Sequence, residues 1–142
     1  MAADTAAPAC IFCEIIAGRA PAYRVYEDDA TVAFLDIFPF TRGHLLVVPR
    51  RHVDRITDLD PSEYPGFLAT VAEMCRRVDR LSRHYNVALN QGALAGQIVF
   101  HLHLHLIPRY GETNPFLAPH RERLTDMEAA AVLRDLHAGS AG

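Results

Sequence analysis

The chain has 142 residues and a mass of 15.8 kDa, with 50% of its residues apolar and 22% charged, a composition typical of one globular domain. All 14 residues in the Lys+Arg count are arginine, which excludes chemistry that needs lysine, such as a Schiff base or a P-loop. The net charge of −3, the lack of a long apolar run and the sparse cysteines predict no nucleic-acid partner, no membrane partner and a cytoplasmic location.

Residues 1–9 are rich in alanine and are predicted to be a flexible N-terminal tail. One domain is expected over 10–142, with its core in 10–110 and a C-terminal tail and helix in 111–142. Apolar patterning and turn residues predict, in chain order, one short helix and three strands: 11–16, 23–26, 31–37 and 44–48.

The longest periodic signal covers residues 61–84 and predicts a long helix, which Asp60 and Glu63 begin as a capping box around Pro61. Its apolar stripe consists of Tyr64, Phe67, Leu68, Val71, Met74, Cys75, Val78 and Leu81. The remaining predicted elements are two strands and a weak helix: 86–90, 98–107 and 125–136. Strands in hairpin-like succession around one long helix predict an antiparallel α+β domain.

Three histidines alternate with apolar residues in the last predicted strand: His101, His103 and His105. Because successive strand side chains point to opposite faces, one face would carry three imidazoles, about 6.5–7 Å apart. Three interpretations are open. The histidines are ordinary surface residues; or they bind a metal, although one straight strand spreads the rings widely for a single ion; or one imidazole is a nucleophile that its neighbours orient.

The residues around these histidines resemble the signature of the histidine triad (HIT) family. The matches, in chain order, are Cys10-Ile11-Phe12-Cys13, Asp36-Ile37, Pro39, Gly43-His44, Pro49, His52, Asn90-Gln91-Gly92, Ala95-Gly96-Gln97, Val99 and His101-Leu102-His103-Leu104-His105. The resemblance covers about residues 10–110 and is closest to Hint-like and small bacterial HIT hydrolases. It implies a sheet of about five strands, one long helix, a short N-terminal helix and a homodimer.

The resemblance also implies a role for each histidine of the catalytic set. His103 corresponds to the nucleophile that attacks the α-phosphorus of a nucleotide, expels the leaving group and forms a nucleotidyl-histidine that water hydrolyses. His101 and His105 flank it, and His44 matches an additional supporting histidine. An ordinary imidazole pKa near 6.5 leaves the neutral, nucleophilic form abundant at neutral pH.

A nucleotide pocket follows from the same resemblance. Asp36 matches the acidic residue that accepts hydrogen bonds from the ribose hydroxyls, and a turn-capping role is the alternative. Backbone N–H groups of a glycine loop suit the phosphate. The implied base-binding residues, for which ordinary core packing is the alternative, are Ile11, Phe12, Ile15, Phe34 and Ile37. The implied phosphate-proximal residues are Asn90, Gly96, Gln97, Ile98, His103 and His105.

Position 98 departs from the family pattern, which usually has Ser or Thr after the Gly-Gln pair. Ile98 offers only its backbone N–H to the phosphate or leaving group. The expected consequence concerns turnover and leaving-group preference, and the nucleophile is unaffected.

Cys10 and Cys13 form a Cys-x-x-Cys pair. A redox motif would need a thioredoxin-like context that the sequence lacks, and a structural zinc site needs two further ligands. By the resemblance these ligands are His52 and His101, which gives a Cys₂His₂ zinc site. A reduced, metal-free pair is the alternative.

The resemblance therefore predicts an enzyme that hydrolyses a purine nucleoside phosphoramidate, or a related nucleotide, at the α-phosphate, with structural Zn²⁺ and no organic cofactor. The alternatives are a dinucleoside polyphosphate hydrolase, a nucleotide-binding protein with weak activity, and a hydrolase that uses the triad as zinc ligands.

Overall fold

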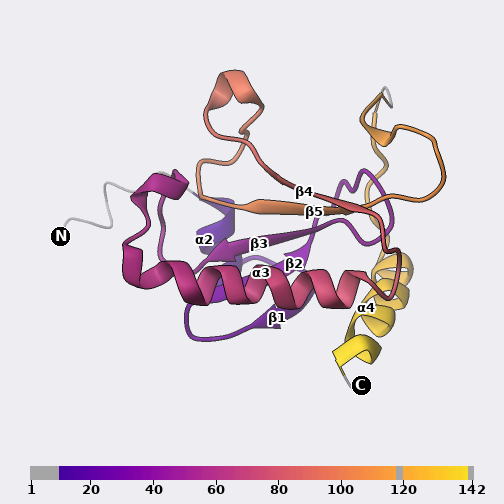
Figure 1. The fold of residues 1–142 in the computed structure, drawn as a ribbon, viewed down its shortest axis with the longest axis horizontal. Helices are drawn as coiled ribbons and strands as arrows, with labels where there is room; N and C mark the ends of the chain where they lie inside the picture. Colours follow the sequence, from indigo (N-terminus) through magenta and orange to yellow (C-terminus); the bar gives the residue numbers. More distant parts are fainter. Residues whose placement is uncertain (1–9, 118–119, 141–142) are drawn as a thin grey trace.

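Five strands form one antiparallel sheet in the order β1-β2-β3-β5-β4 (Figure 1). The structure is a computed structural model that describes residues 10–117 and 120–140, so the predicted tail at 1–9 lies outside the described residues. The strands are β1 (Arg24–Glu27), β2 (Thr31–Leu35), β3 (Leu45–Pro49), β4 (Tyr85–Leu89) and β5 (Leu104–Pro108). The predicted α+β class is confirmed.

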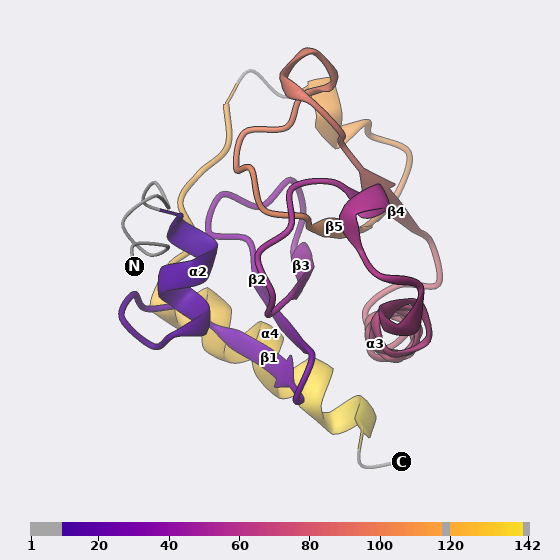
Figure 2. The ribbon, with the colours of Figure 1, turned by 90° about the vertical axis from the view of Figure 1, so that its left-hand side faces the viewer.

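Different helices cover the two faces of the sheet (Figure 2): α2 (Ile11–Ile16) on one face, and α3 (Tyr64–Val78) with α4 (Asp126–Ser140) on the other. Strand side chains alternate between the faces. The side chains that pack with α2 are Val32, Phe34, Leu46 and Val48, and those that pack with α3 and α4 include Ala33, Leu35, Leu45 and Val47. Both faces of β2 and β3 are therefore buried.

Helix α3 is shorter than the predicted 61–84. Its capping box forms as expected around a 3₁₀ turn at Pro61–Glu63, and the α-helix ends at Val78. Leu81 leaves the helical stripe, and its side chain occupies the space that a Cβ on Gly43 would need. Gly43 has φ +90°, so glycine is required there for two reasons. The stripe prediction is also wrong for Tyr64 and Leu68, which are 48% and 68% exposed.

Strand β5 begins at Leu104, whereas the predicted strand covers 98–107. The N–H of Leu102 donates to the carbonyl oxygen of Val53 at 2.7 Å instead of joining the sheet, and Phe100 is 47% exposed. His101 and His103 therefore reach their positions from an irregular segment, and the strand-face argument is correct only for His105.

The other helices agree more closely with the patterning. Helix α2 matches the predicted 11–16, and Gly18 follows it with φ +81°. Helix α4 continues past the predicted end at 136. Within the described residues, no helix has the length and apolar character to cross a membrane.

Candidate active site and metal centre

A cavity of about 590 Å³ opens on the face of the sheet that α2 covers. Its volume is that of a small-molecule site, and mainly apolar walls with a few polar groups suit a nucleoside. All the predicted nucleotide-binding residues except Gln97 line it: Ile11, Phe12, Ile15, Phe34, Asp36, Ile37, Asn90, Gly96, Ile98, His103 and His105. His105 points to this face because its partner in β3 is Leu46, which packs with α2.

His103 has its proton on the nitrogen that faces the main chain. Its Nδ1–H donates to the carbonyl oxygen of His101 at 2.7 Å, because a carbonyl can only accept. The neutral ring therefore carries its lone pair on Nε2. The side chain is 7% exposed, and its ring meets Phe12 edge to face, with centroids 5.0 Å apart. A main-chain contact thus selects the tautomer that nucleophilic catalysis needs.

His44 and His105 form a directed hydrogen-bond chain. The N–H of Phe40 donates to His44 Nδ1 at 3.0 Å, so the proton of neutral His44 is on Nε2, which donates to His105 Nδ1 at 3.0 Å. His105 must then carry its own proton on Nε2. The rings of His103 and His105, 5.0 Å apart, therefore have complementary roles: one offers a lone pair and the other an N–H donor.

Burial keeps the imidazoles neutral. Desolvation is the main cause that lowers the pKa of His44 to about 3 and that of His105 to about 4, and the nearby histidines and Arg121 add to it. Desolvation also lowers the pKa of His103. The site therefore presents uncharged rings at neutral pH.

Asp36 lies beside these rings and serves as a turn cap as well as a cavity residue. Its Oδ1 accepts from the N–H of Phe38 at 2.8 Å, and its Oδ2 is 3.5 Å from His44 Nε2. Burial raises the pKa of this carboxyl above its ordinary value. The capping role and the predicted ribose role are compatible, because a carboxylate has acceptor capacity left over.

Gln97 stabilises the loop before β5 and does not line the cavity, so the cavity gives no support to its predicted nucleotide contact. Its side chain is 5% exposed, and its Oε1 accepts from the N–H of Gly92 at 2.7 Å. Its Nε2 donates to Asp54 Oδ1 at 3.0 Å and to the carbonyl oxygen of Val99 at 3.2 Å. The oxygen and the nitrogen of the Gln97 side-chain amide therefore both have hydrogen-bond partners within the protein.

The backbone N–H groups of this loop also differ from expectation. Those of Gly96 and Gln97, predicted at the phosphate, donate to the carbonyl oxygens of Ala93 and Gly92. Among the described residues, no acceptor is recorded for the N–H of Ile98. Ile98 is 80% exposed at the cavity, so its N–H is available to an anion.

Cys10, Cys13, His52 and His101 converge at the start of α2. Cys13 Sγ is 3.2 Å from His52 Nδ1, and both sulfurs are 3.6 Å from His101 Nδ1. A tetrahedral zinc ion with bonds of 2.0–2.3 Å holds such atoms roughly 3.3–3.8 Å apart, so the cluster fits zinc. His101 Nε2–H donates to the carbonyl oxygen of Pro49 at 2.8 Å, which leaves the lone pair of Nδ1 facing the sulfurs.

The thiol of Cys13 is protonated when no metal is bound. Burial, followed by the neighbouring Cys10, raises its pKa to about 11. Binding of a metal would release this proton, because thiolate is the ligand form.

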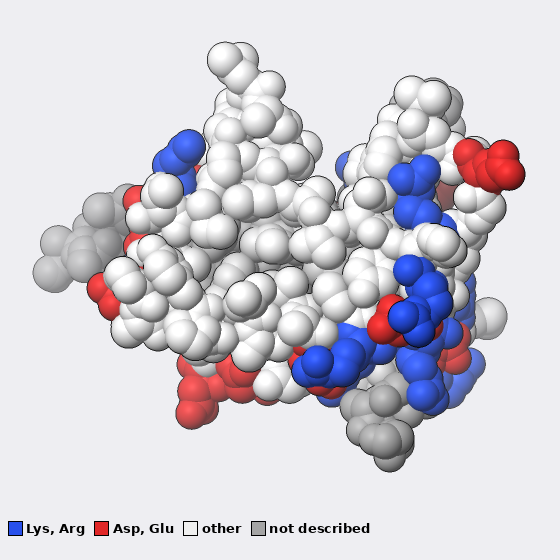
Figure 3. All heavy atoms as spheres, in the orientation of Figure 1, with Lys and Arg blue, Asp and Glu red and all other residues white. Residues whose placement is uncertain are grey.

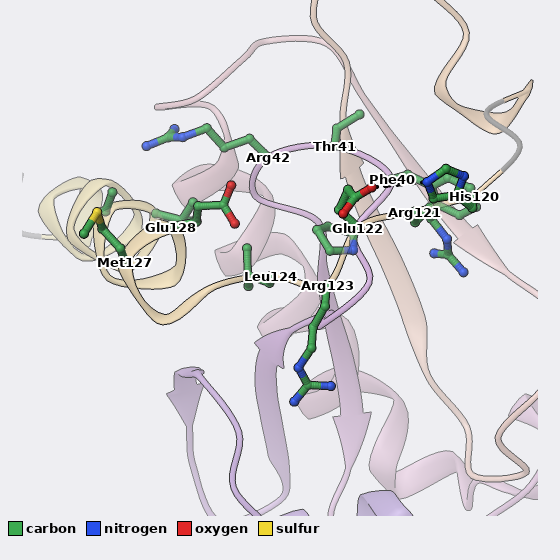
Figure 4. Close-up of a pocket in the computed structure, with 13 residues that line it drawn as sticks. Phe40, Thr41, Arg42, His120, Arg121, Glu122, Arg123, Leu124, Met127 and Glu128 are labelled. Carbon is green, nitrogen blue, oxygen red and sulfur yellow. Dashed lines mark hydrogen bonds and ion pairs between the residues drawn. The ribbon is translucent and has the colours of Figure 1, made fainter.

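The sequence interpretation missed Arg121, Arg123, Phe38 and Phe40, which also line the 590 Å³ cavity. Arg121, Arg123 and Phe40 line a second cavity of about 550 Å³ as well (Figure 4). No motif includes the two arginines, which lie beyond the matched region. The signal that could have identified them is the Arg-x-Arg pair itself, since arginine is the only residue type in this chain that can supply a permanent cation to a phosphate site.

Residues 17–112, more than half of the chain, match the model of the HIT domain. The chain belongs to the HIT domain family. This HIT protein is 48% identical over 101 residues to an uncharacterized HIT-like protein of Mycobacterium tuberculosis, with 70% of each chain covered. It is 38% identical over 109 residues to the adenylylsulfatase HINT3 of Arabidopsis thaliana, covering 70% of this chain and 52% of that protein.

Solved structures agree with this assignment. A zinc-bound histidine triad family protein from Mycobacterium smegmatis superposes with a TM-score of 0.78 at 37% identity, covering 94% of this chain and 98% of that one. A hypothetical histidine triad nucleotide-binding protein from Sulfolobus tokodaii has a TM-score of 0.82 at 27% identity, covering 92% and 91%. The Cys/His cluster is compatible with the zinc in the first of these.

Proposed function

We propose that this HIT protein hydrolyses a nucleotide at the α-phosphate through a covalent nucleotidyl-histidine at His103. One observation carries the proposal: a main-chain hydrogen bond leaves Nε2 of His103 unprotonated in a ring that lines a nucleotide-sized cavity. The adenylylsulfatase activity named for the Arabidopsis relative and the nucleotide-binding name of the Sulfolobus neighbour support it.

In this proposal the nucleoside occupies the apolar part of the cavity. The base packs near Phe12 and Phe34, whose rings meet edge to face with centroids 5.3 Å apart, and the ribose hydroxyls donate to Asp36. The α-phosphate then lies at His103 and His105. The N–H of Ile98, which lines the same cavity, is the second donor that we assign to this phosphate.

The chemistry proceeds in two displacements. The lone pair of His103 Nε2 attacks the α-phosphorus, and the bond to the leaving group breaks. The Nε2–H of His105 donates to a phosphoryl or leaving-group oxygen, where it stabilises developing negative charge. Water then displaces the imidazole and releases the nucleoside monophosphate. Both imidazoles begin the cycle neutral because they are buried.

The substrate class is a purine nucleoside phosphoramidate or a related nucleotide, with dinucleoside polyphosphates as the second candidate. The test is a panel of adenosine and guanosine phosphoramidates and dinucleoside polyphosphates with the parent protein and His103→Ala. The proposal expects turnover that His103→Ala abolishes, and a labelled intermediate that is acid-sensitive and base-stable. Turnover that survives His103→Ala would refute it.

A nucleotide-binding protein with weak activity remains the second function, because Ile98 places no hydroxyl at the cavity where the family usually has one. Nucleotide binding by the parent protein without label or turnover would favour this function. Immediate loss of chemistry on addition of a chelator would favour the triad as zinc ligands instead.

We also propose that Cys10, Cys13, His52 and His101 hold one structural zinc ion. The spacing of their ligand atoms supports this set, and zinc would cross-link α2 to the segment after β3 and to the segment before β5 and thus stabilise the fold. Zinc content well below one ion per chain in protein purified without chelator would contradict the site.

A homodimer through α3 and β4 is a further part of the proposal. β4 is an edge strand, Val87 in it is 46% exposed, and Tyr64 on α3 is 48% exposed near Leu68. Figure 3 shows few charged side chains at the centre of this face. A second copy could pair with the edge and cover the apolar side chains. Leu68→Glu should give a monomer in sedimentation velocity, whereas Leu117→Glu should not; a monomeric parent protein would refute the dimer.

A further inference from the structure

Residues 120–125 form a segment along the mouth of the nucleotide cavity. The N–H of Leu124 donates to the carbonyl oxygen of Ile37 at 2.7 Å, which fixes the segment to the loop after β2. In Figure 4, Arg121 and Arg123 extend to one side and Glu122 to the other. Both arginines line the 590 Å³ cavity, whereas Glu122 lines only the second cavity. The segment therefore directs two guanidinium groups toward the nucleotide.

Aromatic rings hold both arginines in place. Arg121 Cζ is 4.1 Å from the ring centroid of Phe40, and Arg123 Cζ is 5.8 Å from that of Phe38. Phe40 in turn stacks on His44, with centroids 5.6 Å apart and planes at 19°. A cation over a ring face keeps its N–H donors free at the edge of the guanidinium plane. The arginines are thus positioned before any ligand arrives.

Arg121 acts electrostatically on the Asp36 carboxyl, where it opposes the rise in pKa that burial causes. Neither Arg121 nor Arg123 forms a direct ion pair with a carboxylate within residues 10–117 and 120–140. Many other arginines of the chain do, for example Arg19 with Glu14 at 2.9 Å and Arg42 with Asp135 at 2.7 Å. The charge of Arg121 also reaches the catalytic rings, because it contributes, after burial, to the lowered pKa of His105. Two positioned guanidinium groups that form no direct ion pair, next to a phosphate site, are suited to an additional anionic group.

We propose that Arg121, assisted by Arg123, selects nucleotides whose leaving group is an anion, such as sulfate or a phosphate chain, over nucleotides whose leaving group is an amine. This inference rests on the proposed hydrolysis at the α-phosphate, and it places nucleotides with an anhydride bond there ahead of the phosphoramidates. Guanidinium binds sulfate and phosphate oxygens alike, so both sources share one chemistry.

The chemistry of the first displacement agrees with this preference. The bond from His103 Nε2 to phosphorus forms, the bond from phosphorus to the bridging oxygen breaks, and its electron pair leaves on sulfate or phosphate, which needs no proton at neutral pH. An amine must gain a proton as it leaves, and His44 and His105 are both held neutral. In the second displacement, water gives its oxygen to phosphorus and a proton to solvent.

The second cavity provides room for a large leaving group. It has about 550 Å³ and shares Phe40, Arg121 and Arg123 with the nucleotide cavity, so the arginines lie between the two spaces. A small anion such as sulfate would need only the arginines. A phosphate chain with a second nucleoside would continue past them.

The test compares kcat/KM of the parent protein, Arg121→Gln and Arg121→Lys on three substrates: adenosine 5′-phosphosulfate, diadenosine tetraphosphate and adenosine 5′-phosphoramidate. Loss of a charge-assisted hydrogen bond predicts that Arg121→Gln lowers kcat/KM about 10- to 100-fold on the two anhydrides. The phosphoramidate should change less than about 3-fold, and Arg121→Lys should recover part of the loss. Arg83→Gln is the matched control, because the Arg83 side chain is 82% exposed and lines neither cavity.

Equal losses on all three substrates would overturn the inference, because Arg121 would then act on the common nucleotide portion, and so would no loss on the anhydrides. A loss on one anhydride only would identify which anion the arginine recognises and would support the inference.

A binding experiment separates this inference from the proposed function. The experiment measures binding of AMP and ADP to His103→Ala, with and without Arg121→Gln. ADP carries one phosphate more than AMP, so Arg121→Gln should weaken the binding of ADP at least 10-fold and that of AMP much less. If the parent protein turned over no nucleotide, the hydrolase would be refuted, and the two dissociation constants alone would decide the role of Arg121.

Discussion

The buried, neutral histidines should make the protein lose stability steeply in mild acid. His44 and His105 have pKa values of about 3 and about 4 in the folded state, below the ordinary 6.5. Because folding holds these rings neutral, the unfolded chain binds more protons than the folded chain between about pH 4 and 6.5. Their contribution to the free energy of unfolding is fully present above pH 6.5 and is lost as the pH falls toward 4.

The size of the effect follows from proton linkage. Each ring that is protonated only in the unfolded state changes the free energy of unfolding by about 1.4 kcal/mol per pH unit, so the pair contributes close to 3 kcal/mol per unit near pH 5. His44→Gln removes one titrating ring. Its amide can still accept from the N–H of Phe40 and donate to His105, so the hydrogen-bond chain survives. The slope should fall by about 1.4 kcal/mol per unit.

The assay is urea unfolding, followed by circular dichroism, at half-unit steps between about pH 5 and 6.5. Comparing variants cancels the contribution of other titrating groups, including His101. Val78→Ala is the control, because it empties space at a fully buried site and costs about 2 kcal/mol without removing a charge. A parent-like slope in His44→Gln, or a reduced slope in Val78→Ala, would refute the reasoning.

Three further predictions concern the cavity and the metal site. Ile98→Ser places a hydroxyl at the cavity wall and should raise kcat on a phosphoramidate several-fold; a clear loss in a folded variant would count against the placement of this loop. Cys13→Ser should lose bound zinc and, where free metal exceeds Kd 100-fold, roughly 3 kcal/mol of stability; elemental analysis and melting curves test this, and unchanged zinc would exclude Cys13 as a ligand. Phe12→Ala removes a ring that is 6% exposed and should cost about 3–5 kcal/mol by urea unfolding, with the milder Phe12→Leu used to measure weaker nucleotide binding; unaltered affinity in Phe12→Leu would argue against a base site there.

Local patterns predicted what depends on neighbours in the sequence. The capping box at Asp60 and Glu63 formed as expected, and all the predicted nucleotide-binding residues except Gln97 line one cavity. The predicted strand at 98–107 was too long because alternation of apolar and polar residues does not reveal where a backbone N–H donates. The N–H of Leu102 donates to Val53, a partner far away in the sequence.

Other features depend on contacts between distant segments, which a single sequence does not encode visibly. Gln97 matched the motif, but its side-chain amide bonds to Gly92, Asp54 and Val99 and lies outside the lining of the cavity. Arg121 belongs to no motif, and it reaches the cavity only because Leu124 is tied to Ile37. In both cases the type of residue was visible in the sequence, but the groups that its side chain contacts could be identified only from the three-dimensional structure.

Residue 101 acts on His103 through its main chain, so the tautomer of His103 does not depend on which side chain residue 101 carries. The carbonyl that fixes the tautomer of His103 belongs to the backbone, and every amino acid at position 101 would supply it. The imidazole of His101 is engaged elsewhere, between the two sulfurs and Pro49. Mutations can therefore add or remove the proposed metal ligands one at a time while the proposed nucleophile keeps its proton on the same nitrogen, so the two proposed roles can change independently.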